Sequence, residues 1–257
     1  MRRIRITISY DGTHYHGWQV QRGLPTIQQT LEDIISGMEG RPVHVASSGR
    51  TDAGVHAYGQ VAAFNIENPI PCDNLRRAVN RLLPRDIRVT DVRETHAGFN
   101  PRHDAVAKTY EYRIYRREIC SPFEHRFVFH HPYPLDESRM NAAARLLEGK
   151  FDFTAFAASD DQNKLPKVRT IFSSLGESQG ERWIYRVRGT GFLKQMVRNI
   201  IGVLVQVGKG TLAEMDVRAR LVPGCGIPPG PTSPASGLFL LSVEYPEGGV
   251  THQLETG

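Results

Sequence analysis

The 257-residue sequence has few cysteines and no long run of apolar residues. Its three cysteines, Cys72, Cys120 and Cys225, are odd in number, lie far apart and form no CxxC pair, which argues against a disulfide framework and a thiolate zinc site. No stretch approaches the ~20 apolar residues that a membrane-spanning helix requires, and no apolar core follows the basic N-terminus. We therefore expect a cytoplasmic chain without a membrane partner.

Common cofactor and catalytic motifs are also missing. The segment 202–211, GVLVQVGKGT, has one residue too many for a phosphate-binding loop and ends a helical pattern instead of preceding one. The glycines of segment 223–234 miss the dinucleotide-binding spacing, and neither GxSxG nor HExxH occurs. None of these segments predicts a phosphate-binding loop, a dinucleotide-binding site or a motif-based hydrolase or zinc site.

The charge of the chain is weakly basic and is carried mainly by arginine. Lys and Arg number 32 against 27 Asp and Glu, a net charge of +5, and only six of the 32 are lysines. The planar guanidinium suits phosphates and base edges, so this composition favours a nucleic-acid partner, although only modestly for a chain of this length. Hydrophobic residues make up 40% of the chain, as in ordinary globular proteins.

Hydrophobic periodicity predicts the order βαββαβ in the first half. Apolar residues alternate in segment 3–10, and a Thr26–Gln29 capping box begins a helix that ends near Gly40. Two short strands follow, at 43–47 and 60–66. A second helix, capped by Asp73, stops at Pro84 before a strand at 87–92.

The second half predicts the same order with one additional short helix. An alternating strand at 105–116 precedes a helix that Asp136 caps and Gly149 ends. The remaining expected elements are strands at 168–174 and 183–188, a helix at 196–207, a short helix boxed by Thr211 and Glu214, and a strand at 238–245.

These patterns predict an α+β fold built from two βαββαβ units, each a split βαβ arrangement of the ferredoxin or RRM type. The units correspond to residues 1–104 and 105–257. We expect them to form one broad mixed or antiparallel sheet with helices on one face and a central active-site cleft on the open face. The proline- and glycine-rich segment 223–234 is expected to form a stiff, ordered loop.

The segment 49–57, GRTDAGVHA, lies between two predicted strands and contains the most distinctive cluster of polar residues. On chemistry alone, Asp52 followed by Ala and Gly is most simply a turn whose carboxylate accepts backbone hydrogen bonds. A catalytic carboxylate is the less frequent alternative for so short a motif.

Eight blocks in sequence order nevertheless resemble the family of tRNA pseudouridine synthases. They are YDGT (10–13), GWQVQ (17–21), TIQQTLE (26–32), GRTDAGVHA (49–57), KTYEYRI (108–114), DFTAF (152–156), MVRNIIG (196–202) and GLFLLSVEY (237–245). The resemblance implies isomerisation of uridine to pseudouridine at positions 38, 39 and 40 of the tRNA anticodon stem-loop. It also implies a homodimer that acts on tRNA and not on DNA, without metal or organic cofactor.

The resemblance assigns roles to four residues. Asp52 matches the catalytic aspartate, and an ionised carboxylate suits attack on, or stabilisation of, a sugar centre with oxocarbenium character. Arg198 matches an arginine that pairs with this aspartate, Tyr110 a tyrosine that packs on the target base, and Arg50 an arginine that enters the RNA helix where the base leaves. Whether Asp52 attacks C1′, assists glycal formation or adds to the base, and which group accepts the C5 proton, stay open.

Two other functions fit parts of the sequence. Paired βαββαβ units with aromatic strands also occur in RNA-binding proteins without catalytic activity, although no RNP1-like string is present on the expected third strands. A nucleoside or glycoside hydrolase that uses Asp52 is the second alternative, but such enzymes usually need a second carboxyl group, and GRTDAGVHA supplies none.

Overall fold

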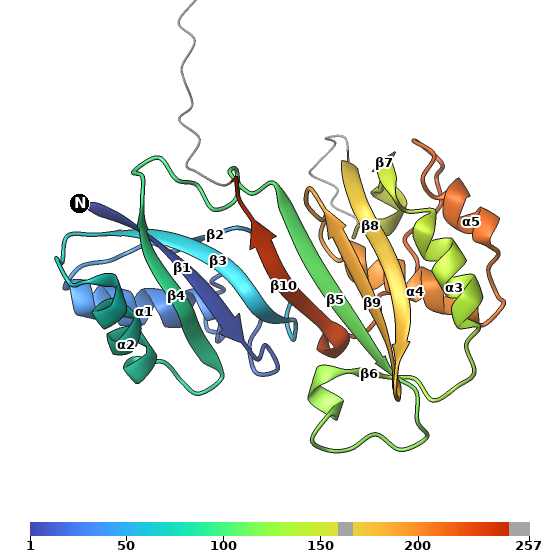
Figure 1. Ribbon diagram of the computed structural model, residues 1–257, viewed down its shortest axis with the longest axis horizontal. Helices are drawn as coiled ribbons and strands as arrows, with labels where there is room; N and C mark the ends of the chain where they lie inside the picture. The colour runs from blue at the N-terminus through green and yellow to red at the C-terminus, as the bar shows by residue number, and fades with distance from the viewer. Residues whose placement is uncertain (159–166, 247–257) are drawn as a thin grey trace, which may run out of the picture.

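A computed structural model describes residues 1–158 and 167–246. In these ranges ten strands form a single sheet with the main order β4-β1-β3-β10-β5-β9-β8-β7, while β2 pairs with β3 and β6 with β5. In Figure 1 the helices lie behind this sheet, α1 and α2 toward one end and α3, α4 and α5 toward the other. The expected α+β class with one large mixed sheet is confirmed. No helix in the described ranges is long and apolar enough to cross a bilayer.

The first half contains four strands and two helices. They are β1 (Arg2–Tyr10), α1 (Ile27–Glu39), β2 (Ala46–Ser47), β3 (His56–Ile66), α2 (Cys72–Leu82) and β4 (Ile87–Thr95). Strand β1 pairs antiparallel with β3 on one side and β4 on the other, and β2 pairs antiparallel with β3. The isoleucines of β1 are buried in alternation, as the period of two predicts.

Where the structure describes it, the second half contains six strands, three α-helices and three single 3₁₀ turns. The elements are β5 (Ala107–Tyr115), η1 (His125–Phe127), β6 (Phe129–His130), α3 (Glu137–Arg145), β7 (Gly149–Asp152), η2 (Thr154–Phe156), β8 (Val168–Gln179), β9 (Arg182–Gly189), α4 (Met196–Gly208), α5 (Glu214–Ala219), η3 (Ala235–Gly237) and β10 (Leu238–Glu244). Strand β10 pairs antiparallel with β5 and, at Phe239 and Leu240, parallel with β3. This last strand of the chain therefore joins the two halves into one sheet.

The helix N-termini follow the sequence signals in two cases and depart from them in two; at the C-termini, Gly40 ends α1 as expected, whereas α3 ends at Arg145 and not at Gly149. Thr26 accepts a hydrogen bond from the Gln29 amide, and Asp136 caps α3 through the Arg139 amide. Asp73, expected as a cap, lies inside the first turn of α2 after Pro71, where a carboxylate still favours the helix dipole. Thr211 was expected to cap α5, but its hydroxyl bonds within the end of α4 and the cap is Ala213.

The shortest strands depart furthest from the prediction. Strand β2 has two residues and starts at Ala46, because the Val43 amide instead donates to the Ser36 hydroxyl. The two-residue β6 and the four-residue β7, which Gly149 opens, were not indicated by the sequence. The longer β3 was expected but begins at His56, four residues before its expected start. Elements of two to four residues are too short to show a hydrophobic period.

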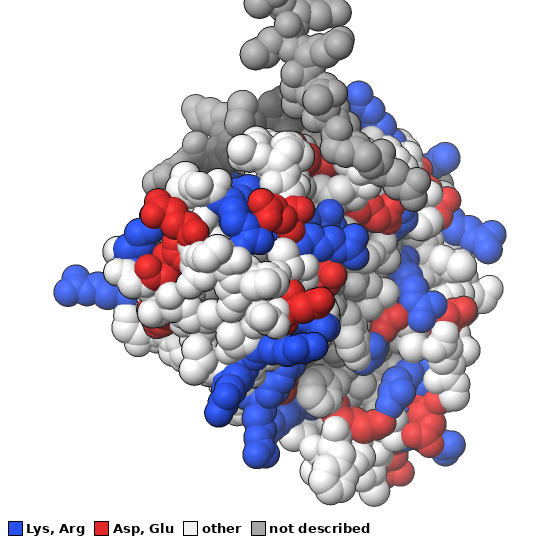
Figure 2. All heavy atoms as spheres, turned by 60° about the vertical axis from the view of Figure 1, so that its left-hand side comes forward, with Lys and Arg blue, Asp and Glu red and all other residues white. Residues whose placement is uncertain are grey.

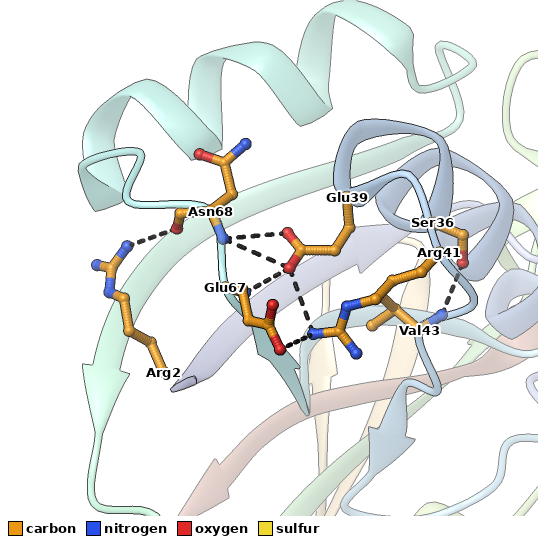
Figure 3. A network of polar contacts seen from close by, with 7 residues as sticks. All are labelled: Arg2, Ser36, Glu39, Arg41, Val43, Glu67 and Asn68. Atoms are coloured by element: carbon orange, nitrogen blue, oxygen red, sulfur yellow. Dashed lines mark hydrogen bonds and ion pairs between the residues drawn. The ribbon is translucent and has the colours of Figure 1, made fainter.

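The end of α1 is tied to the end of β3 by a polar network, shown in Figure 3. The Glu39 carboxylate accepts from the amides of Glu67 and Asn68 and pairs with Arg41 at 3.4 Å. Arg2 donates to the Asn68 carbonyl at 3.3 Å. This network fixes the outer end of the first half, distant from the segment that carries Asp52.

Candidate active site

Asp52 lies in the loop between β2 and β3, and its carboxylate faces helix α4 of the other half. Arg198, in the first turn of α4, places Nη1 3.0 Å from Asp52 Oδ2. The Asp52 side chain is 26% exposed and that of Arg198 15%, so the pair is partly withdrawn from water but accessible from one side. Arg198 is one of the few residues of α4 that are not buried.

The Arg198 guanidinium is held from a second direction by the loop 223–234. Its Nε donates to the Ser233 carbonyl at 2.8 Å, and the Ser233 amide donates back to the Arg198 carbonyl at 3.2 Å. The loop packs on α4 so closely that a Cβ added at Gly202 would lie 1.7 Å from the Pro231 carbonyl oxygen. The two bonds use different edges of the planar fork and therefore fix its direction toward Asp52.

The Asp52 loop is packed against the segments around Gly12 and Gly17. A Cβ at Gly12 would lie 2.0 Å from the Val55 carbonyl oxygen, and one at Gly17, whose φ is +86°, would lie 2.5 Å from the Thr51 carbonyl oxygen. Thr51 also shares a 2.8 Å hydrogen bond with the buried Tyr10 hydroxyl. Two of the sequence blocks, YDGT and GWQVQ, therefore contain the residues against which the Asp52 loop packs.

Tyr110 extends from β5 into the same region. Its ring is buried and packs edge-on against Phe192, with ring centroids 5.0 Å apart. Burial raises the pKa of the Tyr110 hydroxyl well above its usual value, and the nearby charges of Tyr10 and Asp52 act in the same direction. Tyr110 therefore stays protonated at neutral pH, which suits a packing surface better than a proton acceptor.

Arg50 is exposed beside this region, two residues before Asp52. The preceding residues are fixed: the Gly49 carbonyl accepts from the Ser47 hydroxyl and the Gln60 amide, and the Ser48 carbonyl accepts from Lys108 Nζ at 2.6 Å. Arg50 therefore extends a long, exposed side chain from a loop whose backbone is held by hydrogen bonds.

The position of the site corrects one expectation. The cleft was expected on the sheet face without helices, yet Asp52 meets Arg198 on α4, on the side where the helices lie (Figure 1). The two helix groups, α1 with α2 and α3 with α4 and α5, are associated with different halves, and the pair forms where the halves meet. A cavity of about 320 Å³ lies elsewhere, lined by His56, Tyr58, Arg113 and Phe239 among others, and Asp52 does not line it.

Several contributors to the site were not singled out from the sequence. Ser233 acts through its backbone carbonyl, which leaves no trace in residue type, and Phe192 has no distinctive sequence context. Lys108 appeared only as one member of an alternating strand. Its burial and its bond to Ser48 could have been suspected only from its place on the apolar face of that strand, beside Tyr110 and Tyr112.

Comparison with known proteins gives one consistent result. A family model described as tRNA pseudouridine synthase matches residues 6–104 and 143–246. The chain is 62% identical over 248 residues to tRNA pseudouridine synthase A of Solibacter usitatus, a match that covers 95% of this chain and 100% of that protein. It is 44% identical to the Syntrophotalea carbinolica protein of the same name, with 94% and 96% covered, and 39% identical to that of Geobacillus kaustophilus, with 99% of each chain covered.

A carboxylate–arginine pair between a loop and a helix of an α+β scaffold defines a candidate enzyme site, and the matches identify its class. The chain belongs to the tRNA pseudouridine synthase family. The family expected from the eight sequence blocks is confirmed, and with it the interpretation of the chain as an enzyme of the isomerase class.

Proposed function

We propose that this protein isomerises uridine to pseudouridine at positions 38, 39 and 40 in the anticodon stem-loop of tRNA, without a cofactor. The observation that carries the proposal is the Asp52–Arg198 pair, in which a partly exposed carboxylate is hydrogen-bonded and oriented by a guanidinium. Family membership supports the reaction class. The relatives bear the name tRNA pseudouridine synthase A, which supports tRNA as the substrate.

The reaction breaks the N1–C1′ bond, turns the uracil within the site and joins C5 to C1′. Asp52 acts at the sugar as nucleophile or charge stabiliser, because a carboxylate matches an oxocarbenium-like centre. The bond to C5 replaces the C5 hydrogen, which leaves as a proton, while N1 gains a proton. The net process is therefore an isomerisation without redox change.

Tyr110 contacts the target base, and Arg50 contacts the RNA helix that the base leaves. A uridine paired in the stem must be extruded at a cost of a few kcal/mol. The ring of Tyr110, held by Phe192, provides a surface on which the extruded uracil packs. Arg50, exposed on its fixed loop, is long enough to stack in the vacated position.

We also propose that the enzyme is a cytoplasmic homodimer. Segment 116–133 exposes large apolar side chains, Ile119 at 81% and Phe123 at 89%, and such side chains mark association surfaces when they cluster. Light scattering of the purified protein tests this state, and a monomer at micromolar concentration would contradict it.

The two halves, 1–104 and 105–257, are proposed to be repeats of one split βαβ unit. The family model matches one segment in each half. The strand orders β4-β1-β3-β2 and β10-β5-β9-β8 correspond position by position, and all pairs within each are antiparallel.

The test is to incubate the protein with tRNA transcripts that carry uridine at 38, 39 and 40, map pseudouridine in the product, and assay free uracil. Pseudouridine at these positions without free uracil is the expected result. Free uracil would identify a hydrolase, and tight binding with unchanged RNA would identify a binding protein. Pseudouridine only at other positions would overturn the assignment of the anticodon stem-loop.

A further inference from the structure

Lys108 is a lysine with an unusual set of neighbours. It lies on β5, and Nζ donates to the Ser48 carbonyl at 2.6 Å. A Cβ at Gly49 would lie 2.9 Å from Nζ, so the glycine leaves the space that the ammonium occupies. Within the described residues Lys108 forms no ion pair. An ammonium has three N–H donors, and the bond to Ser48 uses one of them.

Among the described residues, the charged groups that act on Lys108 are both cations. Burial, Arg102 and Arg169 lower the pKa of Lys108 to about 8, and Arg102 also lowers the pKa of Arg169. Each of the two arginines is therefore near enough to Lys108 to act on its charge. In residues 1–158 and 167–246 none of the three pairs with a carboxylate, whereas eleven other arginines do.

This cationic cluster, defined as Lys108, Arg102 and Arg169, adjoins the candidate active site. Lys108 and Tyr110 are two residues apart on the same face of β5, about 7 Å along the strand. Lys108 pairs across the sheet with Gly189, which pairs with Ile171 two residues after Arg169. In a nucleotide a ribose separates the base from the phosphate, and this distance is similar to the separation of Tyr110 and Lys108 along the strand.

Other cations of the sheet are paired with carboxylates. On the face in Figure 2, many Lys and Arg lie beside Asp and Glu, while one group of them gathers toward the lower part of the view. On β5, β9 and β10, the arginines Arg113, Arg186 and Arg188 are neutralised by Glu111 and Glu244. The three cations beside Tyr110 lack a carboxylate partner in the described residues, so their charge is available to an anion.

We propose that Lys108, Arg102 and Arg169 bind a backbone phosphate of the RNA adjacent to the nucleotide whose base enters the Asp52–Tyr110 site. The inference rests on the proposed function and deepens it. Two free N–H donors of Lys108 and the two guanidinium groups supply the charge-assisted hydrogen bonds that a phosphate requires. Because Lys108 also holds the Ser48 carbonyl, the same phosphate contact fixes the base of the Asp52 loop.

The experiment couples each side chain to a single phosphate. Full-length tRNA is ligated from synthetic pieces with a neutral methylphosphonate at one linkage on either side of the target uridine. Dissociation constants are measured for Arg102→Ala, Arg169→Ala and Lys108→Met, with Arg77→Ala on α2 as an exposed control that also removes one positive charge. Circular dichroism and thermal melting verify folding, and pseudouridine formation by the wild type is measured on the unmodified tRNA.

On unmodified tRNA each cluster variant is expected to bind roughly 3- to 10-fold more weakly, with the salt slope of log Kd reduced by about one. On tRNA with the contacted phosphate neutralised, the affinity of the wild type falls by the same factor, and the affinities of the cluster variants fall no further. Arg77→Ala changes the affinity by the same factor on every RNA.

Equal losses for the cluster variants on native and neutralised RNA would overturn the proposal. If Lys108→Met does not fold, Arg102→Ala and Arg169→Ala decide the question, because their side chains extend into solvent or lie half-exposed. Failure of the proposed function is separate: it would appear as the absence of pseudouridine with the wild type, whatever the coupling to phosphate.

Discussion

Arg198 Nη1 lies 3.0 Å from Asp52 Oδ2 although 146 positions separate the two residues in the chain. One belongs to a loop of the first half and the other to a helix of the second, and β10 joins the halves between them. The geometry of the pair thus depends on assembly of the whole sheet.

Replacing Arg198 tests whether the guanidinium serves the carboxylate. Arg198→Ala is expected to lower kcat roughly 100-fold or more while the Kd for tRNA changes less than about threefold, since the lost donor acts on developing charge. The kcat of Arg198→Lys should lie between those of the wild type and Arg198→Ala, because an ammonium cannot reproduce the fork that spans Asp52 and the Ser233 carbonyl. A loss of affinity as large as the loss of turnover would instead identify Arg198 as a phosphate contact.

Gly202 and Gly37 form a matched pair of helical glycines. A Cβ at Gly202 would lie 1.7 Å from the Pro231 carbonyl oxygen, whereas nothing lies within 4 Å of one at Gly37 in α1. Gly202→Ala should displace the loop that holds Arg198, with reduced kcat and a lower melting temperature. Gly37→Ala should stabilise the protein by up to about 1 kcal/mol through helix propensity. Equal behaviour of the two variants would show that the loop does not position Arg198.

Gly17 and Gly23 separate backbone strain from contact with the catalytic loop. Both have positive φ, +86° and +75°, so alanine is strained at either position, by roughly 1 kcal/mol or more. Only at Gly17 would the new Cβ press on Thr51, next to Asp52, at 2.5 Å. Gly17→Ala is expected to lose much more activity than Gly23→Ala in assays at a temperature where both are folded. Comparable activity in the two would argue against transmission through Thr51.

The pKa of Lys108 predicts a pH dependence of tRNA binding. Burial and the charges of Arg102 and Arg169 lower this pKa to about 8, so in the free protein Lys108 is charged below pH 8 and loses its charge above it. A bound phosphate favours the charged form. The affinity for tRNA should therefore fall between pH 7 and pH 9 in the wild type and fall less in Lys108→Arg, whose guanidinium stays protonated. Fluorescence titrations at constant ionic strength measure the affinity of both proteins, and parallel pH curves would contradict a role for the Lys108 charge in tRNA binding.

The sequence patterns predicted the long elements, and the family resemblance predicted the pairing of Arg198 with Asp52 that the structure shows. Strand β1 and helices α1 and α4 carry clear periods, which local packing obeys. The turn interpretation of Asp52 is correct for the backbone, since its carbonyl accepts from the Val55 amide. Its carboxylate, expected to accept backbone hydrogen bonds, instead accepts from Arg198.

The side of the sheet on which the site lies could not be predicted. It is decided by Asp52 meeting Arg198 across the join of the halves, a long-range contact that no local pattern encodes. Similarly, Ser233 contributes a backbone carbonyl, and Lys108 is distinguished only by the cations near it in space. These are properties of tertiary structure and not of residue type.

The most direct test of the account compares wild type with Asp52→Asn, an amide of nearly the same size, on tRNA labelled with tritium at C5 of uridine. The account predicts that the variant binds tRNA within about threefold of wild type and releases tritium at least ~10³-fold more slowly, because the ionised carboxylate is lost. Tritium release by Asp52→Asn at a rate near that of wild type would contradict the central claim that Asp52 carries the reaction.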